Sequence, residues 1–201
     1  NTTASNNTAV GYYALEANTT GVENTAVGMH SLGNNTTAQS NSAVGYASLV
    51  ANTTGNYNSA LGRHALSSNQ TGNRNVGIGY YSLATNTASD NTAVGYNSLC
   101  KNTTGTYNTA LGTLALDANI TTNSNTAIGY AALGVNVASN NTAVGTSSLD
   151  ANTTGTTNVA VGVAALGANT TASNNTAVGA SALTANITGA QNTAVGFESL
   201  K

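Results

Sequence analysis

The sequence predicts an all-β chain folded as a parallel β-solenoid of about twelve coils. A five-residue phrase of the type NTAVG recurs twelve times, first at Asn7 and last at Asn192. The glycines that close it are 17 residues apart nine times and 16 twice. Since Val, Thr and Asn are poor helix formers, we expect each 16–17-residue unit to form one coil with two short strands and two turns, pairing in parallel with the next.

The full unit reads N-T-A-V-G-Y-x-[AS]-L-x-x-N-T-T-G-x-x, and its residues are numbered here as positions 1 to 17. Four positions never vary among the twelve phrases: Asn at 1, Gly at 5, Leu at 9 and, wherever the unit reaches it, Asn at 12. The repeat runs through the whole chain, so residues 1–201 are expected to form a single domain without distinct caps. Uncapped ends predict either a longer array or end-to-end stacking of copies.

Side chains of a strand alternate between its two faces, so positions 2 and 4 share one face and positions 1 and 3 the other. Because positions 2 and 4 hold Thr and Val, we expect them inside the coil, packed against the Leu row that begins with Leu15, Leu32 and Leu49. The Ala row at position 3 would then form a flat outer strip covered by sister chains. The opposite assignment, with Asn and Ala inside, remains open.

Both invariant Asn rows are expected to form hydrogen-bonded ladders along the stack, about 4.8 Å per step. Asn is also a common turn former, which is the alternative explanation. A turn preference alone would admit Asp, Gly or Ser at some of these positions, so the ladder is favoured. The first members of the two rows are Asn7, Asn24, Asn41 and Asn58 at position 1, and Asn18, Asn35 and Asn52 at position 12.

The phrase at Asn7–Ala14 and Asn125–Ala132 resembles the head repeats of trimeric autotransporter adhesins. The longer phrase at Asn91–Gly105 is similar to arrays in phage tail fibres and bacterial surface proteins. The resemblance implies a left-handed β-roll, three chains packed side by side, and an extracellular location at a cell surface or on a virion fibre. A second similarity is to the ice-binding β-rolls of plants.

No catalytic, cofactor or metal site stands out in the sequence. Only 5% of residues are charged, and four basic residues give no footprint for nucleic acid. His30 and His64 are two coils apart, too far to share a metal ion, and Cys100 occupies a variable position. No apolar run is long enough to insert into a membrane. We therefore expect a protein that is not an enzyme.

One strip of side chains could bind a partner. Tyrosine follows the invariant glycine in five units, and it either covers a turn or a seam between subunits or stacks against a glycan or a host surface receptor. The five residues are Tyr12, Tyr46, Tyr80, Tyr96 and Tyr130.

The function expected from the sequence is that of a structural or adhesive extracellular rod built from identical chains. The first alternative is an ice-binding β-solenoid, for which a file of Thr at position 2 is the sequence feature. The second is a β-fibre that assembles end to end, which low charge and the absence of Pro favour.

Overall fold

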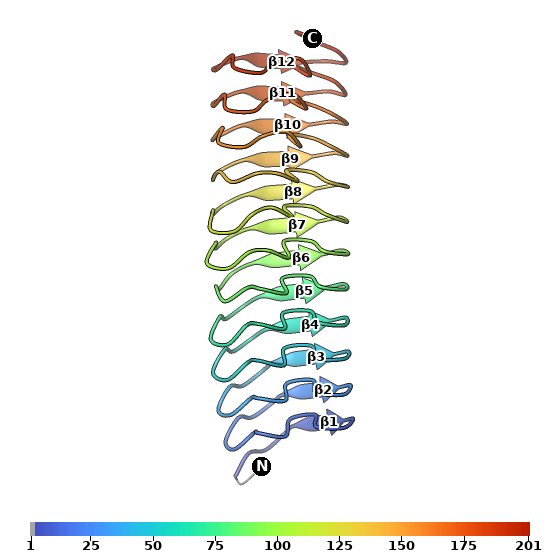
Figure 1. Ribbon diagram of the computed structural model, residues 1–201, viewed down its shortest axis with the longest axis vertical. Helices are drawn as coiled ribbons and strands as arrows, with labels where there is room; N and C mark the ends of the chain where they lie inside the picture. The colour runs from blue at the N-terminus through green and yellow to red at the C-terminus, as the bar shows by residue number, and fades with distance from the viewer. Residues whose placement is uncertain (1–2) are drawn as a thin grey trace.

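The computed structural model describes residues 3–201 and confirms the predicted parallel β-solenoid. Its strands stack in one column, with the first and the last strand at opposite ends of the rod (Figure 1). They form one parallel sheet in strictly sequential order. The strands are β1 (Thr8–Val10), β2 (Thr25–Val27), β3 (Ser42–Val44), β4 (Ser59–Leu61), β5 (Val76–Ile78), β6 (Thr92–Val94), β7 (Thr109–Leu111), β8 (Thr126–Ile128), β9 (Thr142–Val144), β10 (Val159–Val161), β11 (Thr176–Val178) and β12 (Thr193–Val195).

Each coil of residues 3–201 contributes one strand rather than the two that we expected. The strand covers positions 2 to 4, and turns occupy most of the remainder. Hydrogen bonds between coils nevertheless continue outside the sheet, for example from the amide of Thr19 to the carbonyl of Thr36 at 2.9 Å. The register is uniform, since Thr8 pairs with Thr25 and Ala9 with Ala26, so equal positions of successive units lie above one another.

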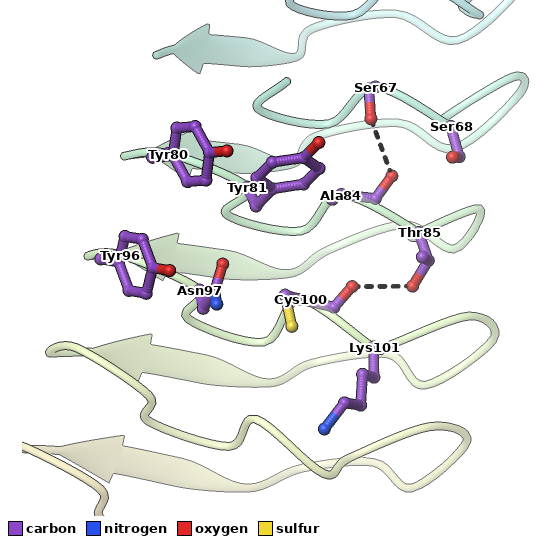
Figure 2. Close-up of a pocket in the computed structure, with 10 residues that line it drawn as sticks. All are labelled: Ser67, Ser68, Tyr80, Tyr81, Ala84, Thr85, Tyr96, Asn97, Cys100 and Lys101. Atoms are coloured by element: carbon purple, nitrogen blue, oxygen red, sulfur yellow. Dashed lines mark hydrogen bonds between the residues drawn. The ribbon is translucent and has the colours of Figure 1, made fainter. Parts of the chain in front are cut away.

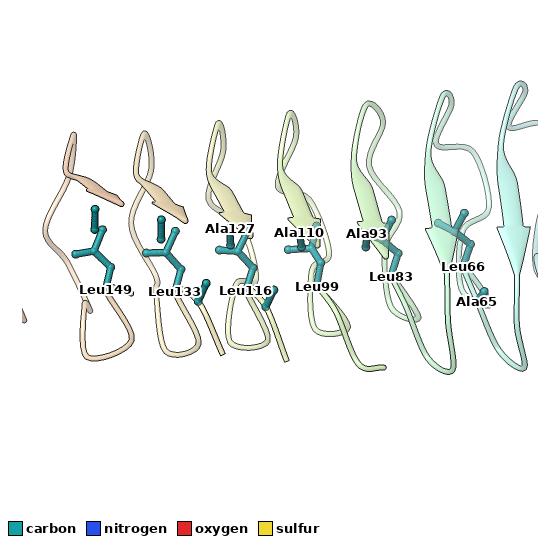
Figure 3. Packing of buried hydrophobic residues seen from close by; sticks show 14 of the residues in the cluster. Ala65, Leu66, Leu83, Ala93, Leu99, Ala110, Leu116, Ala127, Leu133 and Leu149 are labelled. Carbon is teal, nitrogen blue, oxygen red and sulfur yellow. The ribbon is translucent and has the colours of Figure 1, made fainter. Parts of the chain in front are cut away.

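The expectation that Thr and Val point into the coil is wrong. From Ala26 to Ala194 every Ala at position 3 is at most 3% exposed, whereas no residue at position 2 or 4 is buried. The core consists of this Ala row, the Leu row and the Ala residues next to Leu, as Figure 3 shows. The Ala strip therefore lies inside each coil and cannot be the contact between sister chains.

The reason for this orientation is the small space between the two sides of a coil. Gly77 stands in the Ala row, and a methyl group added to it would lie 3.1 Å from Cγ of Leu66. A side chain the size of Val would overlap the Leu row, so only Ala or Gly fits at position 3. The larger side chains at positions 2 and 4 must face outward.

From Asn18 to Asn175 both Asn rows are buried, and they are hydrogen-bonded along the stack. At position 12, Asn35 donates from Nδ2 to Oδ1 of Asn18 at 2.8 Å and to the carbonyl of Ala38 at 3.1 Å. At position 1, Oδ1 of Asn24 accepts the amide of Asn41 at 3.0 Å, and its Nδ2 donates to the same Ala38 carbonyl at 2.8 Å. The two rows thus meet at one turn and satisfy it from both sides.

The position-12 ladder changes at the two 16-residue units, 75–90 and 125–140. Oδ1 of Asn69 is buried and has no hydrogen-bond partner, and in the shortened coil Nδ2 of Asn86 donates to the carbonyl of Ala88, two residues on, where Asn35 uses a carbonyl three residues on. Beyond the break the ladder resumes, since Oδ1 of Asn86 accepts a hydrogen bond from Nδ2 of Asn102 at 2.7 Å. Loss of one residue therefore interrupts a single ladder step and leaves the stack continuous.

Three non-glycine residues in each complete coil have a left-handed backbone, at position 7, at position 9 and at the last position of the unit. Position 9 is Leu throughout, with φ between 48° and 53°. A left-handed residue of this kind costs roughly 1–2 kcal/mol. From Leu32 to Leu166 the same side chains are completely buried, which contributes about 1.5–3 kcal/mol each. Burial therefore offsets the backbone strain.

Substitution of a ladder Asn is expected to destabilise the rod in proportion to its hydrogen bonds. Asn102 donates to Asn86 and Gly105 and accepts from Asn119, so Asn102→Ala should cost about 3 kcal/mol. Asn69→Ala should cost about 2 kcal/mol, because that residue has no acceptor bond to lose. Urea unfolding followed by circular dichroism measures both. The control is Asn34→Ala, at an exposed position that is Ala in several other coils. Equal losses for all three variants would contradict the ladder.

Gly45→Ala should destabilise the stack by at least about 2 kcal/mol. The residue has φ of 129°, and an added Cβ would lie 2.6 Å from the carbonyl oxygen of Gly62 in the next coil. Gly33→Ala is the matched control, because its nearest contact would be 3.3 Å and Ala84 holds the same position in another coil. The midpoint of thermal unfolding should fall for the first variant only.

Candidate interaction surface

The outer face of the sheet carries positions 2 and 4 of every coil. Position 4 is Val, Leu or Ile in all twelve coils, and position 2 is Thr, Ser or Val. Leu61 and Leu111 are 51% and 46% exposed. None of these 24 side chains carries a charge. The face is therefore a long, uncharged strip, with an unbroken branched aliphatic row beside a row made mainly of Thr.

The five tyrosines singled out in the sequence are all exposed, and the structure joins most of them into a band of rings. Tyr80 and Tyr96 are stacked, with ring centroids 5.5 Å apart and planes 5° apart. Tyr12 contacts Tyr13, and the ring of Tyr46 lies 5.3 Å from that of His64. Tyr130 belongs to the same row and has no ring contact within residues 3–201.

Sequence reasoning missed the residues that connect these rings. Tyr13 and Tyr81 stand at position 7, directly after two of the five tyrosines. Tyr13 stacks on His30, and Tyr81 stacks on His64. The guanidinium carbon of Arg63 lies 5.5 Å from the ring centre of Tyr46 and 5.7 Å from that of Tyr80. The signal was available, because equal positions of neighbouring coils must lie next to each other in a register of this kind.

A pocket of about 500 Å³ opens beside the band, in the coils that contain β4, β5 and β6 (Figure 2). Tyr80, Tyr81 and Tyr96 supply its aromatic part, and Asn97 and Lys101 are among its polar lining residues. This volume lies in the range of small-molecule sites.

Two ion pairs join neighbouring coils. Arg74 donates two hydrogen bonds to Asp90, at 2.6 and 2.8 Å, and these bonds lower the pKa of the Asp90 carboxyl. Lys101 pairs with Asp117 at 2.8 Å. Exposed pairs of this kind stabilise proteins little. They do neutralise charge locally, so the pocket next to Lys101 has no uncompensated cation.

Residues 3–201 contain no group of three side chains that could hold a metal ion. His30 and His64 are separated by the ring of Tyr46. Over the same residues no helix has the length and apolarity needed to cross a membrane.

Comparison with known proteins adds no family to this description. The chain matches no protein-family model, no curated protein and no solved structure.

Cys100 should react slowly in the folded chain. Burial, followed by the hydrogen bond and the charge of Asp117, raises the pKa of the thiol to about 12. Alkylation by iodoacetamide at about pH 8.5 should therefore be at least about a hundredfold slower than in urea. Asp117→Asn removes the hydrogen bond to a carboxylate and the negative charge, so it should raise the rate in the folded state. A folded rate equal to that in urea would contradict the raised pKa of this half-buried thiol.

Proposed function

We propose that this chain is a segment of a structural, adhesive rod in which identical chains associate side by side as a homotrimer. The observation that supports the proposal is the uncharged outer face of the sheet, and above all its aliphatic row from Val10 to Val195. Contiguous apolar surface of this length is uncommon on monomeric proteins and marks an interaction site. The contact is thus assigned to positions 2 and 4, in place of the buried Ala row.

A copy of the same chain is the partner that fits this face best. Its rows repeat at the ladder spacing of about 4.8 Å, so a second copy presents the same spacing along the whole rod. Twelve strands of three residues make a strip about 55 Å by about 10 Å, on the order of 550 Å². In a trimer this strip is shared between two neighbours, so it is smaller than the roughly 800 Å² per partner of a standard stable interface, and the side chains that flank it must extend the contact. The face also carries no charged side chain with which a heterologous partner could pair.

The adhesive role and the extracellular location rest on the resemblance of the repeats to adhesin heads and tail-fibre arrays. A stacked-coil scaffold suits a spacer, because hydrogen bonds in register join every coil to the next.

One observation favours ice binding as a second candidate. The Thr file points outward and is uninterrupted over four consecutive coils at Thr92, Thr109, Thr126 and Thr142. Together with Val and its homologues at position 4, it forms a lattice of about 4.8 Å by about 6.6 Å. A flat lattice of methyl and hydroxyl groups can order water. Both candidates use the same face, so a face covered by sister chains is not free to bind ice.

Light scattering tests the first candidate. The wild-type chain, of 19.8 kDa, should show three times its monomer mass at micromolar concentration. Leu61→Lys together with Leu111→Lys should release monomers, because charges on the aliphatic row would be desolvated in the interface. The control combines Ile120→Lys and Ile187→Lys, which are similarly exposed at position 13 and should leave the trimer intact. A monomeric wild-type chain would disprove the trimer.

The second candidate predicts ice shaping and thermal hysteresis by the purified monomer. Thr109→Tyr would raise a bulky ring in the middle of the Thr file and should abolish both effects. Thr104→Tyr, at exposed position 14 on another side of the coil, should have no effect. Absence of ice shaping by the wild-type monomer would remove this candidate.

A further inference from the structure

At the pocket beside β5 and β6, the stack of aromatic rings at position 7 is interrupted. Tyr81 stacks on His64 with centroids 5.0 Å apart and planes 24° apart. The next residue at the same position is Asn97, which is not aromatic and lies on the opposite side of Tyr81 from His64 in the order of the coils. His64 therefore covers one face of the Tyr81 ring, Tyr80 contacts the ring at 4.5 Å with planes 71° apart, and no aromatic residue stands beyond Tyr81 at position 7 of the next coil, where the pocket opens (Figure 2).

Polar groups without protein partners border this pocket. The hydroxyl of Ser68, the carboxamide of Asn97 and the hydroxyl of Tyr81 make no hydrogen bond to another part of residues 3–201. Other polar lining groups are already engaged, since the hydroxyl of Thr85 donates to the carbonyl of Cys100 at 2.8 Å, and Lys101 pairs with Asp117. The free groups include both donors and acceptors, and the pocket has no unpaired charge.

We propose that this pocket binds one neutral pyranose unit of a saccharide. A pyranose ring has a flat face of C–H groups that can lie on the face of Tyr81 opposite His64, and hydroxyls around its edge that can bond to Ser68 and Asn97. A cavity of about 500 Å³ is large enough for one such ring. The paired state of Lys101 argues for a neutral sugar over a sialic or uronic acid. The site is distinct from the outer sheet face and goes beyond the role of the chain as a rod.

Saccharide binding is best tested on the intact chain by NMR. The probes are the methyl glycosides of glucose, galactose, mannose and N-acetylglucosamine, each titrated into isotopically labelled protein, with N-acetyl-tyrosinamide as a non-saccharide probe. At least one glycoside should shift the signals of Tyr81 and Asn97 saturably, with a dissociation constant on the order of 1 mM.

Three variants locate the site. Tyr81→Ala should weaken binding by about tenfold or more, because it removes the stacking face. Asn97→Tyr should also abolish binding, because the new ring would continue the stack into the pocket. Tyr13→Ala is the matched control, since Tyr13 has the same position and stacks on His30 at 5.3 Å in another coil, and it should leave binding unchanged. Ala131 and Ala164 show that position 7 accepts Ala, so Tyr81→Ala and Tyr13→Ala should fold.

The proposal is overturned if no glycoside binds, if N-acetyl-tyrosinamide alone binds, or if Tyr81→Ala retains the wild-type affinity. These outcomes are independent of the oligomeric state, because a trimer without sugar binding would leave the rod proposal standing. A monomer that binds sugar would reject the trimer alone.

Discussion

A buried carboxamide that bonds in two directions is the interaction on which this rod depends. Each inner Asn joins its own coil to a neighbouring coil, and it also satisfies a turn carbonyl that would otherwise be buried without a partner. Asp could not replace it, because a carboxylate has no N–H to donate and carries a charge into the core. The apolar core is only an Ala row and a Leu row deep, so the polar ladders supply much of what fixes one coil on the next. The ion pairs at the surface, by contrast, contribute little to the stability of the rod.

The same thinness explains the unusual backbone. A short coil has to turn sharply, and the turns place three non-glycine residues in the left-handed region. The amide of Gly33 donates to the carbonyl of His30, and the positive φ of Leu32 between them is typical of a type II turn. A Gly there would turn without strain, but it would leave the core without its largest side chain. Leu is retained because a buried side chain outweighs an unfavourable φ.

The coil period, parallel register and Asn rows could be predicted from the sequence, because a repeat in register places equal residues next to each other. Hydrophobicity could not predict which side chains of the strand point into the coil, because it favoured Val94 over Ala93 as the inner residue. The better signal was size: position 3 admits only Ala or Gly, whereas position 4 varies among Val, Leu and Ile. The left-handed turns could also have been recognised in the sequence. β-Branched residues avoid positive φ, and among the non-glycine residues with positive φ in the described chain Thr157 is the one that is β-branched. No feature of the sequence indicated the pocket, because its volume depends on how side chains fill the space between coils.

Positions that hold the stack and positions that can recognise a partner are separate in this chain. Asn, Gly and Leu are fixed at positions 1, 5, 9 and 12 because the coil geometry admits little else. Position 7 has the same backbone in every coil, yet it holds Tyr81 in one coil and Asn97 in the next. Changing its side chain alters the surface without altering the path of the chain. A uniform scaffold with one free position of this kind can therefore present a local site without losing the register on which the whole rod depends.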